Sequence, residues 1–225
     1  AEAAGPPVRL AADLDRLAAE ADLLVEALAP AAVPDVVRAA IARKRDLLVL
    51  SAGGLLEQDA LLEAARRAGI RVRVPSGAIA GLDGVKGAAV GGISRVTIDT
   101  RKPPRALAGS PYVVERGLDL DRLEGETLLF EGSALEACRG FPSNVNVAAA
   151  LSLAGIGPHR TRMRIYAVPG QTRNVHDVTV EGEFGLLRIH IENVPTANPR
   201  TGRLTAQSVI ATLREMAGAG LVVGT

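Results

Sequence analysis

The chain has 225 residues, of which 48% are hydrophobic and 23% are charged, and these proportions suit a folded globular protein with a substantial core. Aromatic residues make up only 2% and tryptophan is absent, so this core must be built from aliphatic side chains. The net charge of +1 gives no electrostatic reason to expect nucleic acid or an anionic membrane as a partner.

The first third of the chain alternates helices with short apolar strands. Helices are expected over residues 14–21, 34–42 and 58–68, and strands over residues 23–28, 46–51 and 70–74. Continuous apolar strands joined by helices of about ten residues indicate right-handed crossovers and a parallel sheet. We therefore expect a first domain with a parallel sheet.

Beyond Pro75 the continuous apolar runs give way to alternating ones. Leu187, Ile189 and Ile191, for example, share one face of a predicted strand, with polar residues between them. Such alternation is typical of a mostly antiparallel sheet with one face in solvent or against a partner. Strands are expected over residues 96–100, 128–130, 163–167, 176–181 and 185–192. Helices that cover the other face of this sheet are expected over residues 81–89, 133–139 and 145–154. A last, amphipathic helix over residues 204–217 is expected to return to the first domain.

Residues 141–157 are the most informative stretch for function, because two asparagines precede a helix of small apolar residues. Asparagine is a good cap for unpaired N–H groups at a helix start, but one helix needs only one such cap. Asn146 is therefore a candidate ligand contact. The alternative is a well-capped, tightly packed helix, and this segment alone does not decide between the two.

Among the three histidines, His176 stands where a Gly-containing loop enters a strand, which is a common place for catalytic groups. His159 and His190 are expected on the surface, and the three do not form a metal-binding set. Cys138 is expected to be a buried structural thiol. Because it is the only cysteine, no internal disulfide can form, which fits a reducing, cytoplasmic location.

Two further segments are candidate binding sites. Residues 100–104 (TRKPP) end a strand with two cations, and either a substrate carboxylate or solvent is their expected partner. Ser76, Gly77 and Ala78 follow a parallel strand at its carboxyl end, where open sheets bind ligands and where small residues allow a planar ring to approach. Charges interrupt every apolar run, so no membrane-spanning helix is expected.

Five motifs, in this order, resemble the L-aspartate dehydrogenase family: residues 75–83, 100–104, 130–134, 141–157 and 174–176. The resemblance covers essentially the whole chain. It implies NAD- or NADP-dependent oxidation of L-aspartate to iminoaspartate, which feeds NAD biosynthesis and otherwise hydrolyses to oxaloacetate and ammonia. It also implies a Rossmann-type domain followed by an α+β catalytic domain that forms a homodimer.

The resemblance implies roles for individual residues as well. The histidine matching His176 is the active-site residue of the family, and the residues matching Ala78 and Asn146 contact the nicotinamide cofactor. A histidine that titrates near neutrality suits deprotonation of the amine or activation of the water that attacks the imine. A dicarboxylate substrate also needs cationic or N–H donors, and Lys102 is predicted to be one from its chemistry.

The chain departs from the family pattern at two places. Val168 stands where the family usually has an aspartate before the proline, and no Gly-x-Gly-x-x-Gly turn occurs. We therefore expect residues 1–75 to be a partial dinucleotide-binding domain, residues 76–200 the catalytic and dimerisation domain, and residues 201–225 a helix returning to the first domain. A related homoserine dehydrogenase or dihydrodipicolinate reductase, or a non-catalytic remnant that only dimerises, is the alternative.

Overall fold

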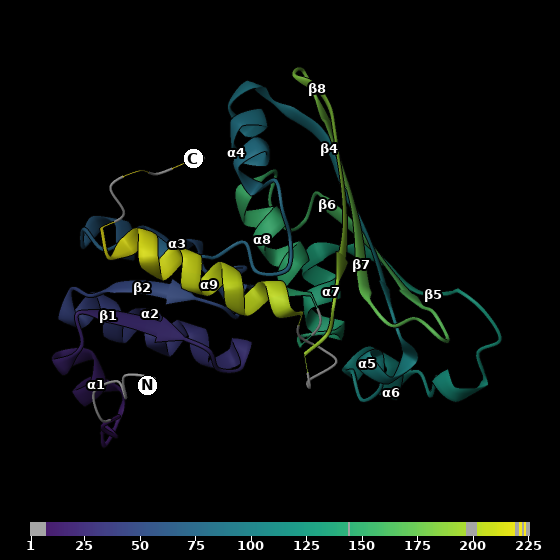
Figure 1. The fold of residues 1–225 in the computed structure, drawn as a ribbon. Coiled ribbons are helices and arrows are strands. Elements are labelled where there is room, and N and C mark those ends of the chain that lie inside the picture. The colour runs from purple at the N-terminus through teal and green to yellow at the C-terminus, as the bar shows by residue number, and fades with distance from the viewer. Residues whose placement is uncertain (1–7, 144, 197–201, 219–220, 222, 224–225) are drawn as a thin grey trace, which may run out of the picture.

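The computed structural model describes residues 8–143, 145–196, 202–218, 221 and 223. The described residues form two sheets, each with its own core (Figure 1). One sheet is parallel and the other is mostly antiparallel, so the predicted fold class is confirmed.

The first sheet has three short strands that pair in chain order and in parallel. They are β1 (Leu23–Glu26), β2 (Asp46–Val49) and β3 (Val72–Arg73), with helices α1 (Leu14–Glu20), α2 (Val33–Arg43) and α3 (Asp59–Arg67). Aliphatic residues of β2 and α2 are fully buried between the layers. Just after α3, Gly69 adopts a φ of +75°, the left-handed conformation that ends many helices.

Two short 3-10 turns follow the carboxyl ends of the first two strands. They are η1 (Pro30–Ala32) and η2 (Ala52–Leu55). A Cβ atom on Gly54 would lie 2.3 Å from the carbonyl oxygen of Pro30 and 2.6 Å from the Val33 Cβ. Only glycine therefore lets η2 pack this closely against η1, and this contact sets the spacing of the two turns.

The second sheet has the order β5-β6-β4-β7-β8. Its strands are β4 (Ile93–Lys102), β5 (Thr127–Ser133), β6 (Thr161–Ala167), β7 (Asn174–Gly182) and β8 (Gly185–Asn193). The pairing of β4 with β6 is parallel, and the other three are antiparallel. Alternation of apolar residues predicts such strands but not which neighbours pair.

Helices α4 (Leu82–Gly91), α7 (Ala134–Gly140) and α8 (Asn146–Ala154) cover one face of this sheet (Figure 1). The core between them is mainly aliphatic, as composition requires, but three of the few aromatic rings, Tyr112, Phe130 and Phe141, pack against one another within it. Three short helical segments that were not predicted link β4 to β5: α5 (Pro104–Leu107), α6 (Pro111–Glu115) and η3 (Leu120–Arg122).

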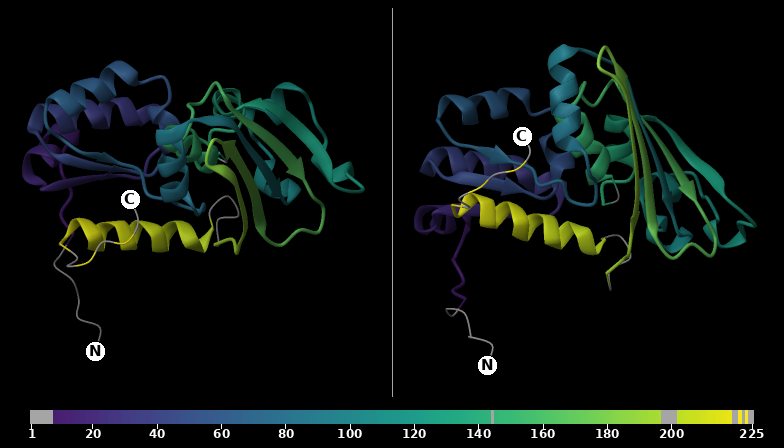
Figure 2. Two further views of the ribbon diagram at one scale, coloured as in Figure 1. Left: turned by 90° about the horizontal axis from the view of Figure 1, so that it is seen from above. Right: turned by 45° about the horizontal axis from the view of Figure 1, so that its top comes forward.

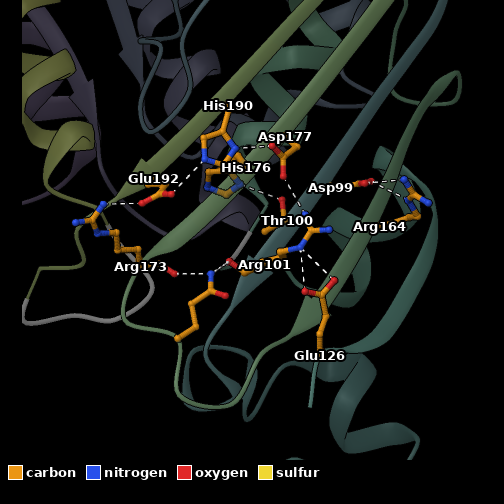
Figure 3. Close-up of polar contacts among 11 residues, drawn as sticks. Asp99, Thr100, Arg101, Glu126, Arg164, Arg173, His176, Asp177, His190 and Glu192 are labelled. Carbon is orange, nitrogen blue, oxygen red and sulfur yellow. Dashed lines mark hydrogen bonds and ion pairs between the residues drawn. The ribbon is translucent and has the colours of Figure 1, made fainter.

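The opposite face of the second sheet carries charged side chains in pairs (Figure 3). Asp99 pairs with Arg164 across β4 and β6, and Arg101 pairs with Asp177 across β4 and β7. Exposed ion pairs of this kind add little stability each. Because successive side chains of a strand point to opposite faces, Thr100 and His176 lie on the helix-covered face, each next to a charged residue of the open one.

The last described helix, α9 (Arg203–Met216), runs beside the first sheet (Figure 2). Near its end Glu215 forms an ion pair of 2.8 Å with Arg73 of β3. A search of the described helices finds none that is both long and apolar enough to cross a membrane.

Candidate functional site

A cavity of about 210 Å³ lies between the two sheets, beside the carboxyl ends of β1, β2 and β3. Open parallel sheets bind ligands at this edge. The cavity brings together all four residues singled out from the sequence. It is lined by Ala27, Leu28, Leu50, Ser51, Ala52, Val74, Pro75, Ser76, Gly77, Ala78, Lys102, Ser143, Asn146, Val147, Ala150, Asn174, His176, Asn193, Gly202 and Thr205.

His176 lines the cavity from β7, directly opposite Thr100 on β4. Its Nδ1 atom contacts the Thr100 Oγ1 atom (Figure 3), at a distance of 3.0 Å. Both side chains are buried. Burial, with a smaller effect from the positive charge of Lys102, lowers the pKa of His176 to about 3. The imidazole is therefore neutral at physiological pH, and the expectation that it titrates near neutrality is wrong.

Lys102 lies two residues beyond Thr100 on the same face of β4, and only 3% of its surface is exposed. The alternative of a solvated strand end is therefore wrong for this lysine. Lys102 lines the cavity, so its positive charge stands where an anionic group of a ligand can bind. Its neighbour Arg101 points to the opposite face and pairs there with Asp177 and Glu126.

Ala78 belongs to a loop that is tied to the end of the second sheet. The side-chain Nδ2 of Asn193 donates to the Ala78 carbonyl oxygen at 2.7 Å. Asn193 is opposite Asn174 in the β7–β8 pairing, and both side chains are buried and line the cavity. Sequence reasoning did not single out Asn193 as a site residue, although an asparagine directly after an alternating strand was a usable signal.

Asn146 is the first residue of α8, and its side chain does not cap the helix. Its Oδ1 atom instead accepts a hydrogen bond of 3.3 Å from the backbone N–H of Gly53 in η2. The amide thus joins the start of α8, which packs on the second sheet, to η2, which follows β2 of the first. Asn144, the other amide of this segment, lies outside the described residues.

Glu26 is a supporting residue of the cavity wall that sequence reasoning missed. Its carboxylate is buried at the end of β1 and accepts hydrogen bonds from the backbone N–H groups of Leu28, at 2.5 Å, and Ser51, at 2.9 Å. The Ser51 hydroxyl donates to the Leu28 carbonyl oxygen at 2.6 Å. These bonds hold together the two chain segments that form one wall of the cavity. An acidic residue ending an otherwise apolar strand was the available signal.

The remaining candidates lie outside the cavity lining. Cys138 is largely buried, and burial raises its thiol pKa to about 12, so it is not a reactive thiolate. His159 is exposed in a turn, and His190 is exposed on the open face of the second sheet. Among the described residues, no group of three histidine, cysteine or acidic side chains is arranged to hold a metal ion.

Comparisons with known proteins match both parts of the chain. Residues 83–216 match the family model for the C-terminal part of aspartate dehydrogenase, and residues 1–75 match that for the NAD-binding domain of homoserine dehydrogenase. L-aspartate dehydrogenase from Methanococcoides burtonii is 48% identical over 208 residues, which are 91% of this chain and 76% of the relative. L-aspartate dehydrogenase 3 from Bordetella bronchiseptica is 46% identical over 215 residues, which are 96% of this chain and 79% of that relative.

A solved structure has the same fold. The crystal structure of aspartate dehydrogenase from Thermotoga maritima superposes with a TM-score of 0.74 at 27% sequence identity. The superposition covers 92% of this chain and 80% of that one. The two-sheet fold is therefore shared with a protein of related sequence.

Proposed function

The chain belongs to the L-aspartate dehydrogenase family, and from this premise we propose that the cavity between its two sheets is where L-aspartate is oxidised to iminoaspartate. The protein is a pyridine-nucleotide-dependent oxidoreductase. The observation that carries the assignment of the site is the meeting of His176, Lys102, Asn146 and Ala78 in one cavity. The match of residues 1–75 to a homoserine dehydrogenase domain does not favour that activity, because Lys102 and His176 belong to the other match.

The cavity fits the nicotinamide end of the cofactor. Ser76, Gly77 and Ala78 form a wall of small residues, and a Cβ on Gly77 would meet nothing nearer than the Pro75 carbonyl oxygen at 4.0 Å. Asn146 lies across the cavity, with its oxygen held by Gly53. We assign its Nδ2 group as a donor to the carboxamide. When bound, the cofactor accepts the hydride that leaves the α-carbon of the substrate.

His176 is the group we assign to proton exchange with the α-amino group of aspartate. Its Nδ1 atom faces Thr100, so Nε2 is the ring nitrogen left for the substrate. A neutral imidazole accepts a proton, whereas an imidazolium does not. The burial that lowers its pKa therefore keeps His176 in the form that this role requires, and it also keeps bulk water from the ring.

Lys102 is the group we assign to one substrate carboxylate. A lysine ammonium forms charge-assisted hydrogen bonds with carboxylates, and Lys102 is buried on the cavity wall, where such a bond is shielded from solvent. The positive charge of Lys102 is one of the two causes that lower the pKa of His176. A substrate carboxylate beside Lys102 therefore offsets part of the effect of the lysine charge on the pKa of His176.

A substrate panel tests the proposed function. Reduced cofactor is measured with L-aspartate, L-homoserine, L-glutamate and L-malate, each with NAD and with NADP. Only L-aspartate is expected to support fast turnover, and the same panel determines the preferred coenzyme. Faster turnover of L-homoserine would overturn the assignment. Calorimetric titration of the protein with each coenzyme tests the alternative of a non-catalytic remnant, which predicts no binding.

We also propose that the protein is a homodimer formed through the open face of the second sheet. The helices α4, α7 and α8 that pack on this sheet lie on its other face (Figure 1), and an open sheet face of paired charges suits a symmetric contact. Sedimentation should give twice the chain mass of 23.3 kDa. A monomeric mass at micromolar concentration would contradict this.

A further inference from the structure

The partner of His176 is a hydroxyl group, although a carboxylate is next to it in sequence. Asp177 points to the opposite face of the sheet, where Oδ1 is 2.6 Å from Nδ1 of His190 and Oδ2 accepts from Arg101 at 2.9 Å (Figure 3). Thr100, on the covered face, is the residue that reaches Nδ1 of His176. The sheet thus separates the carboxylate of Asp177, the next residue in the sequence, from the buried imidazole of His176.

A hydroxyl and a carboxylate constrain an imidazole differently. An ionised carboxylate only accepts, so it fixes a proton on Nδ1 and favours imidazolium. A hydroxyl both donates and accepts, so it stays bonded to Nδ1 whichever ring nitrogen carries the proton. Thr100 can therefore serve both neutral tautomers of His176 without losing the contact.

In the free protein, one neutral tautomer of His176 is favoured in free energy over the other. Thr100 is fully buried, and among the described residues its hydroxyl forms its hydrogen bond with Nδ1 of His176. If Nδ1 carried the proton, the hydroxyl proton would have no acceptor there, which is costly in a buried position. The resting arrangement is therefore Thr100 donating to Nδ1, with the imidazole proton on Nε2.

We propose that Thr100 is a positioning residue whose hydrogen bond to His176 reverses direction when the amino-acid substrate binds. This inference rests on the proposed function, in which the amino group faces Nε2. The substrate ammonium is a donor, so it selects the tautomer with a bare Nε2, and Nδ1–H then donates to Thr100 Oγ1. Proton transfer from the ammonium to Nε2 follows with the ring still held.

Nitrogen NMR of histidine-labelled protein tests the reversal directly. The free protein should show the His176 proton on Nε2. L-aspartate with the reduced cofactor, a pair that cannot react together, should move the proton to Nδ1. Succinate with the same cofactor supplies two carboxylates but no ammonium, and it should leave the proton on Nε2. A proton on Nδ1 in the free protein, or the same response to succinate and aspartate, overturns the proposal.

Variants of Thr100 separate positioning from a general structural effect. Thr100→Val keeps the shape but removes the hydroxyl, and it should shift the Nδ1 resonance and lower kcat about tenfold or more with little change in KM. Thr100→Ser should restore both. Thr97→Val is the matched control, because Thr97 is on the same strand but on the opposite face, across from Thr179.

The outcomes also distinguish this inference from the function on which it rests. Full activity in a His176→Ala variant would contradict the proposed function itself. An inactive His176→Ala variant together with unchanged nitrogen shifts and kcat in Thr100→Val would contradict only the role of Thr100.

Discussion

His176 and His190 lie on neighbouring strands but on opposite faces of one sheet, and their pKa values move in opposite directions. Burial lowers the pKa of His176, whereas hydrogen bonds to Asp177 and Glu192 raise that of the exposed His190. The same side chain is therefore a neutral group facing a cavity in one place and part of a surface ion cluster in the other. The difference is set by which face of the sheet each residue occupies.

This contrast provides a matched pair for testing the catalytic role. His176→Ala should lower kcat for aspartate oxidation by roughly 10²- to 10⁴-fold, the usual contribution of a positioned acid or base. His190→Ala should leave kcat nearly unchanged, because its side chain is on the open face. Steady-state kinetics with L-aspartate measures both. Comparable losses in the two variants would contradict the assignment.

Burial of His176 also makes the stability of the protein depend on pH. The pKa is about 3 in the folded protein and near 6.5 in an exposed histidine, so between these values the unfolded chain binds more protons. The free energy of unfolding therefore falls as pH decreases through this window, by at most about 1.4 kcal/mol per pH unit from this residue.

His176→Gln should flatten that slope, since glutamine does not titrate. Urea unfolding between about pH 4 and pH 6 measures it, with His159→Gln, an exposed histidine, as the control. An equal slope in wild type and His176→Gln would show that the folded protein binds this proton as readily as the unfolded chain.

At the scale of elements, the wall of the cavity depends on how η1 packs against η2. Gly54→Ala places a Cβ 2.3 Å from the Pro30 carbonyl oxygen, so the two turns must separate. Overpacking of this kind typically costs about 1–3 kcal/mol. We expect lower stability and weaker cofactor binding, measured by thermal unfolding and titration.

The control for this variant is Gly87→Ala within α4, where an added Cβ meets nothing within 4 Å. Alanine is the better helix former, so this variant should be neutral or slightly more stable. If Gly54→Ala unfolds at the same temperature as Gly87→Ala, the close packing of the two turns is not required.

At the scale of the whole molecule, the cavity forms where two sheets that share no strand lie next to each other. Asn146 spans the junction through its bond to Gly53. Asn146→Ala should raise the KM for the cofactor about tenfold through loss of an amide contact, with a smaller effect on the KM for aspartate. Ser152→Ala, on the same helix but bonded to Ala148 within it, is the control. A larger change in the aspartate KM would reassign Asn146 to substrate binding.

Much of the architecture was predictable because its signals are local. Continuous apolar runs predicted the buried parallel strands, and alternation predicted the two-faced ones, since periodicity depends only on neighbours in the chain. The link from β4 to β5 was not predicted, because helices as short as α5 and α6 carry too few residues to show a period. Pairing across the second sheet was also invisible to local pattern.

For the site, the sequence by itself determined which chemical groups are present and which segments carry them: His176, Lys102, Asn146 and Ala78, in motifs that resemble one enzyme family. Only the tertiary structure decided how deeply these groups are buried, whether they are protonated and which hydrogen bonds they form. Thr100 is 76 positions from His176, and Glu26 is 25 from Ser51, yet each pair is bonded. Burial, protonation and hydrogen-bond partners depend on such long-range contacts, which arise when the sheets assemble and leave no periodic trace in the chain.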